Sequence, residues 1–92
     1  MRKRALIDKW ILDVLDDASY REGITRTQLI NRILETYNYS VDRQKPPAVA
    51  HEYVKVNIEI TSEKYINLYK ILNNSRVLYI NNILYNYCME NM

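Results

Sequence analysis

Three polar side chains that can recognise hydrogen-bonding groups alternate with apolar residues near the middle of the chain. They are Lys55, Asn57 and Glu59, separated by Val56 and Ile58. Because successive side chains of a β-strand point to opposite faces, this spacing places the three polar groups on one face. An ammonium group suits guanine, an amide suits adenine and a carboxylate can accept from cytosine, so such a face can read base edges. The same pattern is also typical of a strand face that is merely solvated.

Residues suited to enzyme chemistry are few and scattered. His51 is the single histidine and Cys88 the single cysteine, and neither has neighbours in sequence that would complete a metal site or activate a nucleophile. Asp13, Asp16 and Asp17 have the spacing of a solvated helix face. We therefore expect a non-enzymatic protein with no catalytic residue, metal, cofactor or small-molecule substrate.

The first forty residues predict two helices. Apolar residues over 5–19 recur at helical spacing, and Gly23 sits where a left-handed residue would end the helix. Thr25 and Gln28 form a capping box that starts a second helix, which fades over 37–40. The stripe of the first helix consists of Ile7, Trp10, Ile11, Val14, Leu15 and Ala18.

Residues 53–92 predict a strand followed by two helices. Strict alternation marks the strand at 54–60, and Thr61 is expected to cap the next helix. The Asn pair at 73–74 should end that helix, and the dipeptide at 75–76 should start the last one.

The strand at 54–60 has no obvious partner in the sequence. A lone strand leaves its backbone N–H and C=O groups unpaired, so we expect it to pair with a second copy of the chain. The 48% hydrophobic content also favours a homodimer. The expected fold is mostly α, with a helical hairpin at 1–40, a linker at 41–52 around Pro46-Pro47, and a β-α-α unit at 53–92 that pairs across the dimer.

A weak internal repeat runs through the helices. Thr25-Arg26, Ile30-Asn31, Ile33-Leu34 and Tyr37 recur fifty residues later as Ser75-Arg76, Ile80-Asn81, Ile83-Leu84 and Tyr87. Either the chain contains a duplication, or two amphipathic helices with similar starts share these residues by chance.

The second half resembles the ribbon-helix-helix family of DNA-binding proteins. The matching features are the alternating strand, the cap at Thr61, the Asn turn at 73–74 and the sequence over 75–84. The resemblance implies that two chains pair their strands into a ribbon, which enters the major groove of double-stranded DNA and reads bases with its outer side chains. It also implies a small transcriptional regulator, of the kind found in plasmids, phages and archaeal viruses.

The same resemblance implies a phosphate contact where the last helix begins, at Ser75 and Arg76, because free N–H groups and the helix dipole favour anions there. Two features depart from the family pattern: Glu59 adds negative charge, and residues 51–92 carry four Lys/Arg and four Asp/Glu. Further positive charge would have to come from the first half. The candidates are Arg2, Lys3, Arg4, Arg43 and Lys45.

Two alternatives stay open. The helices before residue 40 also resemble the start of winged-helix regulators, with Thr25 to Leu34 as positioning helix, Ala48 to Tyr53 as reader and 54–60 as wing strand. In the other alternative, the chain is an α-helical protein-interaction module, such as an adaptor or inhibitor, which the neutral second half favours. A net charge of +2, a single cysteine and no long apolar run predict a soluble, cytoplasmic protein.

Overall fold

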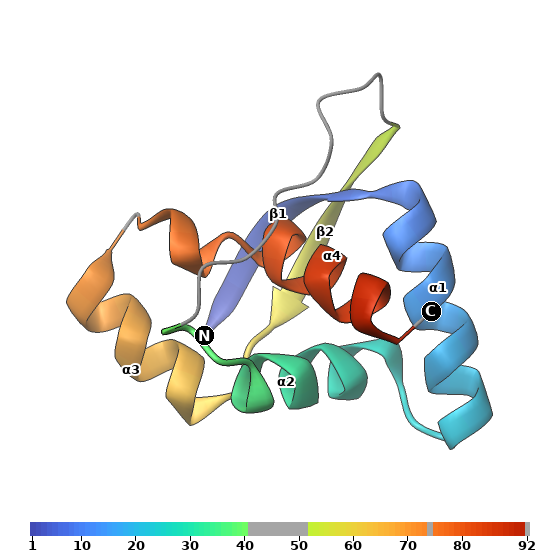
Figure 1. Cartoon of the computed structure of the whole chain (residues 1–92), viewed down its shortest axis with the longest axis horizontal. Helices are drawn as coiled ribbons and strands as arrows, with labels where there is room; N and C mark the ends of the chain where they lie inside the picture. The colour runs from blue at the N-terminus through green and yellow to red at the C-terminus, as the bar shows by residue number, and fades with distance from the viewer. Residues whose placement is uncertain (41–51, 74, 92) are drawn as a thin grey trace.

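The computed structural model describes residues 1–40, 52–73 and 75–91. This part of the chain is mostly α-helical and contains a two-stranded antiparallel sheet. The elements follow in the order β1 (Arg2–Asp8), α1 (Lys9–Glu22), α2 (Arg26–Thr36), β2 (Tyr53–Glu59), α3 (Glu63–Leu72), the short 3-10 helix η1 (Arg76–Leu78) and α4 (Ile80–Glu90) (Figure 1).

β1 is a strand that the sequence pattern did not predict. The first helix begins only at Lys9, so the prediction of a helix from residue 5 is wrong at its start. Ile7 explains the error. It precedes Trp10 and Ile11 at helical spacing, and it also alternates with Ala5 along the strand, so one apolar side chain satisfies both periods.

β1 and β2 pair in antiparallel register, with Arg2 opposite Glu59 at one end and Asp8 opposite Tyr53 at the other. The prediction that the strand of the second half lacks a partner in its own chain is therefore wrong. A second copy is not needed to satisfy the backbone groups on this edge of β2. The argument for a homodimer from an unpaired strand no longer holds.

One hydrophobic core joins the two halves of the chain. The helices cover the inner face of the β1–β2 ribbon, and α4 lies in front of both strands in the view of Figure 1. Residues from before and after the expected linker pack together, so the two halves fold against each other. The largest fully buried apolar side chains are Ile7, Ile11, Leu15, Leu29, Ile30, Leu34, Ile58, Ile60, Tyr65, Ile83 and Leu84.

The predicted ends of the first two helices are confirmed. Gly23 has φ +70°, the left-handed conformation in which a glycine is favoured. The Thr25 hydroxyl accepts from the Gln28 N–H, and the Gln28 side chain accepts from the Thr25 N–H, which completes the capping box. In the second half the cap of α3 is Ser62, one residue after the predicted Thr61.

The last helix starts later than its sequence pattern suggested. α4 begins at Ile80, so the prediction that Ser75 and Arg76 start it is wrong. Leu78 and Ile80 are both 3% exposed, and residues two apart cannot share one helix face. The chain buries both by forming η1, turning through the extended Tyr79 and only then entering α4.

The two halves pack against each other crosswise. Each contributes a strand followed by two helices, β1–α1–α2 and β2–α3–α4. α1 packs against α4, α3 packs against α2, and α2 packs against α4. Exchanging the halves leaves these three helix contacts and the antiparallel pairing unchanged, as a two-fold axis through the ribbon would, whereas the contact of α4 with β1 has no counterpart of similar extent between α2 and β2.

Two asparagines make matching contacts between the halves. The Asn31 Oδ1 atom on α2 accepts from the N–H groups of Thr61 and Ser62, at 2.7 and 3.2 Å, where α3 begins. The Asn81 Oδ1 atom on α4 accepts from the N–H of Asp8 at 3.0 Å, where α1 begins. Asn31 and Asn81 are equivalent positions in the fifty-residue repeat, so the repeat has a counterpart in these crosswise contacts.

Candidate nucleic-acid interface

The outer face of the β1–β2 ribbon brings together polar residues from both ends of the chain. Lys55, Asn57 and Glu59 are exposed, as the alternation in β2 predicted. In the register of the sheet Leu6 lies opposite Lys55, Arg4 opposite Asn57 and Arg2 opposite Glu59. Directly opposed residues of an antiparallel pair share a face, so all six side chains form one surface, which we call the outer face.

Positive charge predominates on the outer face. The outer face carries three cationic side chains and one carboxylate, which are those of Arg2, Arg4, Lys55 and Glu59. The Arg2 Nε atom lies 3.4 Å from Glu59 Oε2. Arg2 therefore offsets the negative charge of Glu59, a feature that departs from the pattern of the ribbon-helix-helix family.

The polar contacts across the outer face are loose. The Arg4 Nε atom donates to the Asn57 Oδ1 atom at 3.4 Å, and both groups are exposed. Exposed pairs at such distances contribute little to folding stability. The hydrogen bond between the Arg4 guanidinium and the Asn57 amide can therefore be replaced by hydrogen bonds to a ligand with little loss of folding stability.

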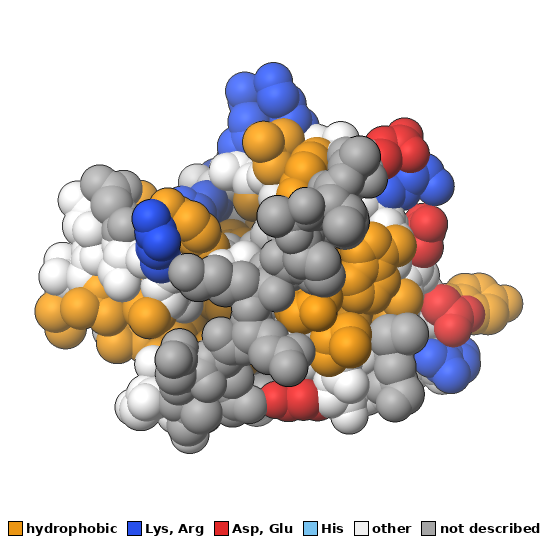
Figure 2. All heavy atoms as spheres, turned by 45° about the horizontal axis from the view of Figure 1, so that its top comes forward, with side chains coloured by type: hydrophobic (Ala, Val, Ile, Leu, Met, Phe, Trp, Pro, Cys, Tyr) orange, Lys and Arg blue, Asp and Glu red, His pale blue; other side chains and the backbone are white. Residues whose placement is uncertain are grey.

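α1 carries charges of both signs on its exposed side. Asp13 and Asp17 pair with Lys9 and Arg21 at i,i+4 spacing. Figure 2 shows acidic and basic side chains next to each other along the edge where α1 lies. The three aspartates of α1 thus belong to a solvated face with ion pairs, and the third one, Asp16, pairs with an arginine of α2.

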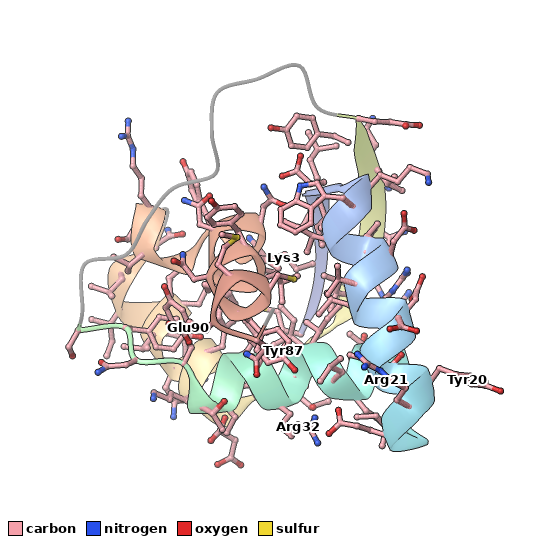
Figure 3. All side chains as sticks on the ribbon, turned by 45° about the vertical axis from the view of Figure 1, so that its right-hand side comes forward. Lys3, Tyr20, Arg21, Arg32, Tyr87 and Glu90 are labelled. Atoms are coloured by element: carbon pink, nitrogen blue, oxygen red, sulfur yellow. The ribbon has the colours of Figure 1, made fainter. Side chains whose placement is uncertain are left out.

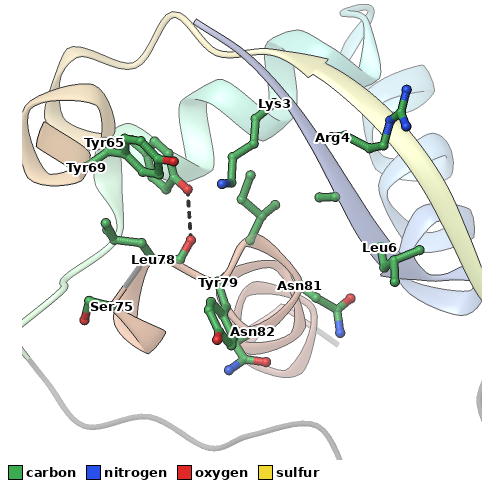
Figure 4. Close-up of a pocket in the computed structure, with 12 residues that line it drawn as sticks. Lys3, Arg4, Leu6, Tyr65, Tyr69, Ser75, Leu78, Tyr79, Asn81 and Asn82 are labelled. Atoms are coloured by element: carbon green, nitrogen blue, oxygen red, sulfur yellow. Dashed lines mark hydrogen bonds between the residues drawn. The ribbon is translucent and has the colours of Figure 1, made fainter. Parts of the chain in front are cut away.

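Lys3 is one of the predicted basic contacts, but it lies on the other side of β1. Its Nζ atom is 4.8 Å from the centre of the Tyr69 ring, a cation–π contact. It points into a hollow of about 310 Å³ between β1, α3, η1 and the start of α4, whereas Arg4 points to the opposite side of the strand (Figure 4). Figure 3 shows Tyr20, by contrast, projecting from α1 away from the rest of the molecule.

Two buried groups near the core keep their protons. Burial raises the pKa of Tyr65 to about 12, and its hydroxyl donates to the Leu78 carbonyl at 2.9 Å. Burial also raises the pKa of Cys88 to about 11, so this thiol is not a thiolate at neutral pH. No group of three His, Cys, Asp or Glu side chains that could hold a metal ion occurs among residues 1–40, 52–73 and 75–91.

Ser75 and Arg76, the predicted phosphate contacts, lie at η1. This 3-10 helix has three residues, and the Ser75 side chain makes no capping hydrogen bond there. The helix start on which the phosphate prediction rested is therefore five residues further along the chain, at Ile80. Arg43 and Lys45 lie outside the described residues.

The winged-helix hypothesis loses part of its basis. Tyr53, the last residue of its reader helix, is the first residue of β2, and Ala48 to His51 fall outside the described residues. A wing needs a strand that returns beside the first one. The partner of β2 in the described chain is β1, which precedes all the helices.

Half of the outer face comes from β1, a strand that the sequence pattern did not predict. The predicted helix over 5–19 includes Leu6, whereas the structure places Leu6 on β1 together with Arg2 and Arg4. The signal was present, because Arg2, Arg4 and Leu6 alternate with Lys3, Ala5 and Ile7. It is weak in isolation, since lysine and alanine on the inner face do not mark a buried side.

No helix in the described part of the chain is long and apolar enough to span a membrane. No protein-family model, curated protein or solved structure matches this chain.

Proposed function

We propose that the protein binds double-stranded DNA in a sequence-dependent manner through the outer face of the β1–β2 ribbon, as a small regulator of transcription. The observation that carries the proposal is the juxtaposition of Arg4, Lys55 and Asn57 on one exposed surface. Arginine and lysine are the side chains that most often read guanine, and asparagine can form two hydrogen bonds with adenine.

The shape of the ribbon supports this proposal. A two-stranded ribbon is narrow enough to enter the major groove, which is about 12 Å wide. Among the described residues the helices pack against the inner face, which leaves the side chains of the outer face exposed towards a duplex. The backbone of each strand is already paired with the other, which leaves the side chains as the reading groups.

The order of elements supports a ribbon-helix-helix arrangement with one modification. The order strand, helix, helix occurs twice, and the two strands pair antiparallel. In the family this chain resembles, two chains each contribute one strand. We propose that one chain here contributes both, so that the ribbon is complete in a monomer.

Arg4→Ala tests the proposal. Affinity for DNA should fall, and the slope of log K against log salt should decrease by about one unit if the guanidinium releases one counterion. Fluorescence anisotropy with a labelled duplex, measured over a salt titration, gives both quantities. Arg76→Ala in the same series tests whether η1 also contacts a phosphate.

Arg21→Ala is the matched control. Arg21 is an exposed arginine with one acidic partner, Asp17, and it lies on α1 away from the ribbon. The control removes the same charge, so a purely nonspecific effect of net charge would lower affinity in both variants equally. Equal losses, or no salt-dependent binding by the unmodified protein at low salt, would contradict the proposal.

Protein interaction is the second candidate, and exposed apolar side chains favour it. Ile71 is 77% exposed and Tyr79 is 52% exposed, and both lie around the end of α3 and η1 with Leu72 and Val77. Such clusters often mark interaction sites. Ile71→Ser should then abolish binding to a protein partner and leave affinity for DNA unchanged.

A further inference from the structure

We infer that the DNA site read by the outer face is not a palindrome and that one chain fills it, an inference that rests on the proposed function. A ribbon built from two identical chains presents two identical strands, and such symmetry matches a palindromic site. β1 and β2 belong to one chain and carry different side chains. The positions at which the side chains of β1 and β2 differ predict where the two halves of the DNA site differ.

The register identifies which residues correspond. The seven pairs of the ladder run from Arg2–Glu59 to Asp8–Tyr53, so Ala5 and Val56 form the central pair. A two-fold axis through this centre exchanges the strands. It carries Arg4 onto Lys55, and Leu6 onto Asn57.

The first of these correspondences is chemically conservative and the second is not. Arg4 and Lys55 are both cations that suit guanine. Leu6 is apolar and 54% exposed, whereas Asn57 is an amide. We expect the site to have guanine at two symmetric positions and different base pairs at the two positions beside them.

Groove chemistry assigns these two different base pairs. Asn57 can pair with the N6 and N7 atoms of adenine, while the side chain of Leu6 can only make apolar contact, as with a thymine methyl group. A palindrome would place the polar edge of adenine against Leu6, where it loses water and gains no hydrogen bond. The asymmetric site avoids this loss.

The outermost positions of the ribbon add to the asymmetry. The same axis carries Asp8 onto Glu59, yet Asp8 is buried and Glu59 is exposed. The Asp8 carboxylate accepts from the Asn81 side chain at 3.0 Å, so it is held within the fold. Of these two positions, only Glu59, opposite Arg2, exposes a carboxylate to a cytosine amino group.

Selection of duplexes from a random pool, followed by affinity measurement, tests the inference. The unmodified protein should select a non-palindromic site. It should bind that site about 5- to 150-fold more tightly than either palindrome made by doubling one half, the range expected for one base contact. Native mass spectrometry of the complex should give one 11.1 kDa chain per duplex.

Two reciprocal variants make the test specific. Leu6→Asn gives each strand a cation and an amide at symmetric positions, so it should shift the preference towards the palindrome built from the half that Asn57 reads. Asn57→Leu should shift it towards the other palindrome. Leu6→Met keeps an apolar side chain and should retain the preference of the unmodified protein. Circular dichroism checks that each variant is folded.

The outcomes separate this inference from the proposed function. Selection of a palindrome by the unmodified protein, with two chains per duplex, would overturn the inference while DNA binding stands. An unchanged preference in both reciprocal variants would also overturn it. Failure to select any duplex at low salt would overturn the proposed function as well.

Discussion

The two halves of the chain build the same order of elements with different junctions. In the first half β1 passes directly into α1 between Asp8 and Lys9, and α1 is joined to α2 by residues 23–25. In the second half residues 60–62 separate β2 from α3, and η1 lies between α3 and α4. The difference teaches why one strand was readable and the other was not. A strand that is separated from the next helix by a short connection shows an uninterrupted period of two. A strand that runs directly into a helix shares apolar residues with that helix, so its own period is obscured.

A charge on the inner face of either strand should have the largest effect. Ile7 and Ile58 lie on different strands but in one core, and each is at most 1% exposed. Ile58→Asp and Ile7→Asp should each lower the free energy of unfolding by about 4 kcal/mol or more, because they bury a charge without a partner. Thermal unfolding followed by circular dichroism should show the loss of all four helices together.

Leu6→Asp is the control for this comparison, since Leu6 points outward from the same ribbon. It should remain folded. If Ile58→Asp unfolds α3 and α4 and leaves α1 and α2 intact, the halves are independent and the shared core has less influence than the contacts suggest.

Removal of the Asn31 or Asn81 side chain should lower the free energy of unfolding by less than a buried charge does, and by different amounts at the two positions. Asn31→Ala leaves two N–H groups at the start of α3 and the Glu59 carbonyl without their side-chain partner. Asn81→Ala leaves the N–H group and one carboxylate oxygen of Asp8 without their side-chain partner. We expect losses of about 2–3 kcal/mol for Asn31→Ala and about 1–2 kcal/mol for Asn81→Ala, because each unsatisfied group adds a desolvation penalty.

Urea unfolding measures both losses. The double variant sharpens the comparison, because the two asparagines serve different junctions and should act independently. Equal losses for the two single variants would mean that the junctions are energetically equivalent in spite of their different hydrogen bonds.

The smallest expected effect is a pH dependence at the contact between α2 of the first half and the start of α3 in the second half. Glu35 on α2 accepts from the Ser62 hydroxyl at 2.6 Å and from the Lys64 N–H at 3.2 Å. These hydrogen bonds, that of Ser62 first, hold the pKa of Glu35 below its ordinary value of 4.5. A lowered pKa stabilises the folded state above pH 4.5, and this contribution is lost as the pH falls through the folded value.

Glu35→Gln should therefore destabilise the protein at neutral pH, and its difference from the unmodified protein should shrink in acid. Unfolding curves at several pH values measure this difference. In a Ser62→Ala background the same substitution should have less effect, since the main partner of the carboxylate is gone. A difference that is constant from neutral pH to pH 3 would contradict the assignment.

Local signals in the sequence predicted local structure well. Gly23 and the capping box at Thr25 and Gln28 depend on residues close in the chain, and both are confirmed. The alternation of β2 placed Lys55, Asn57 and Glu59 on the exposed face. In each case the residues that carry the signal are also the residues that make the structure.

Features that depend on distant residues were not predictable in the same way. The residues of β1 that pair with β2 are 45 to 57 positions away in the sequence, and the inner face of β1 contains Lys3 and Ala5, which do not mark burial. Tyr79 turns the chain because Leu78 and Ile80 must both reach the core, which requires knowledge of where the core lies. The assembly of the outer face from both ends of the chain follows from this tertiary pairing.

The covalent link between β1 and β2 has a consequence for dilute solutions. Strands in one chain meet at an effective concentration that is fixed by the chain between them, whatever the amount of protein present. A ribbon made from two separate chains dissociates on dilution, so its abundance depends on the total concentration by mass action. Here ribbon formation is first order. A compartment that holds only a few copies of the protein therefore holds the same number of complete ribbons, and a titration of the ribbon's ligand should follow a simple hyperbola.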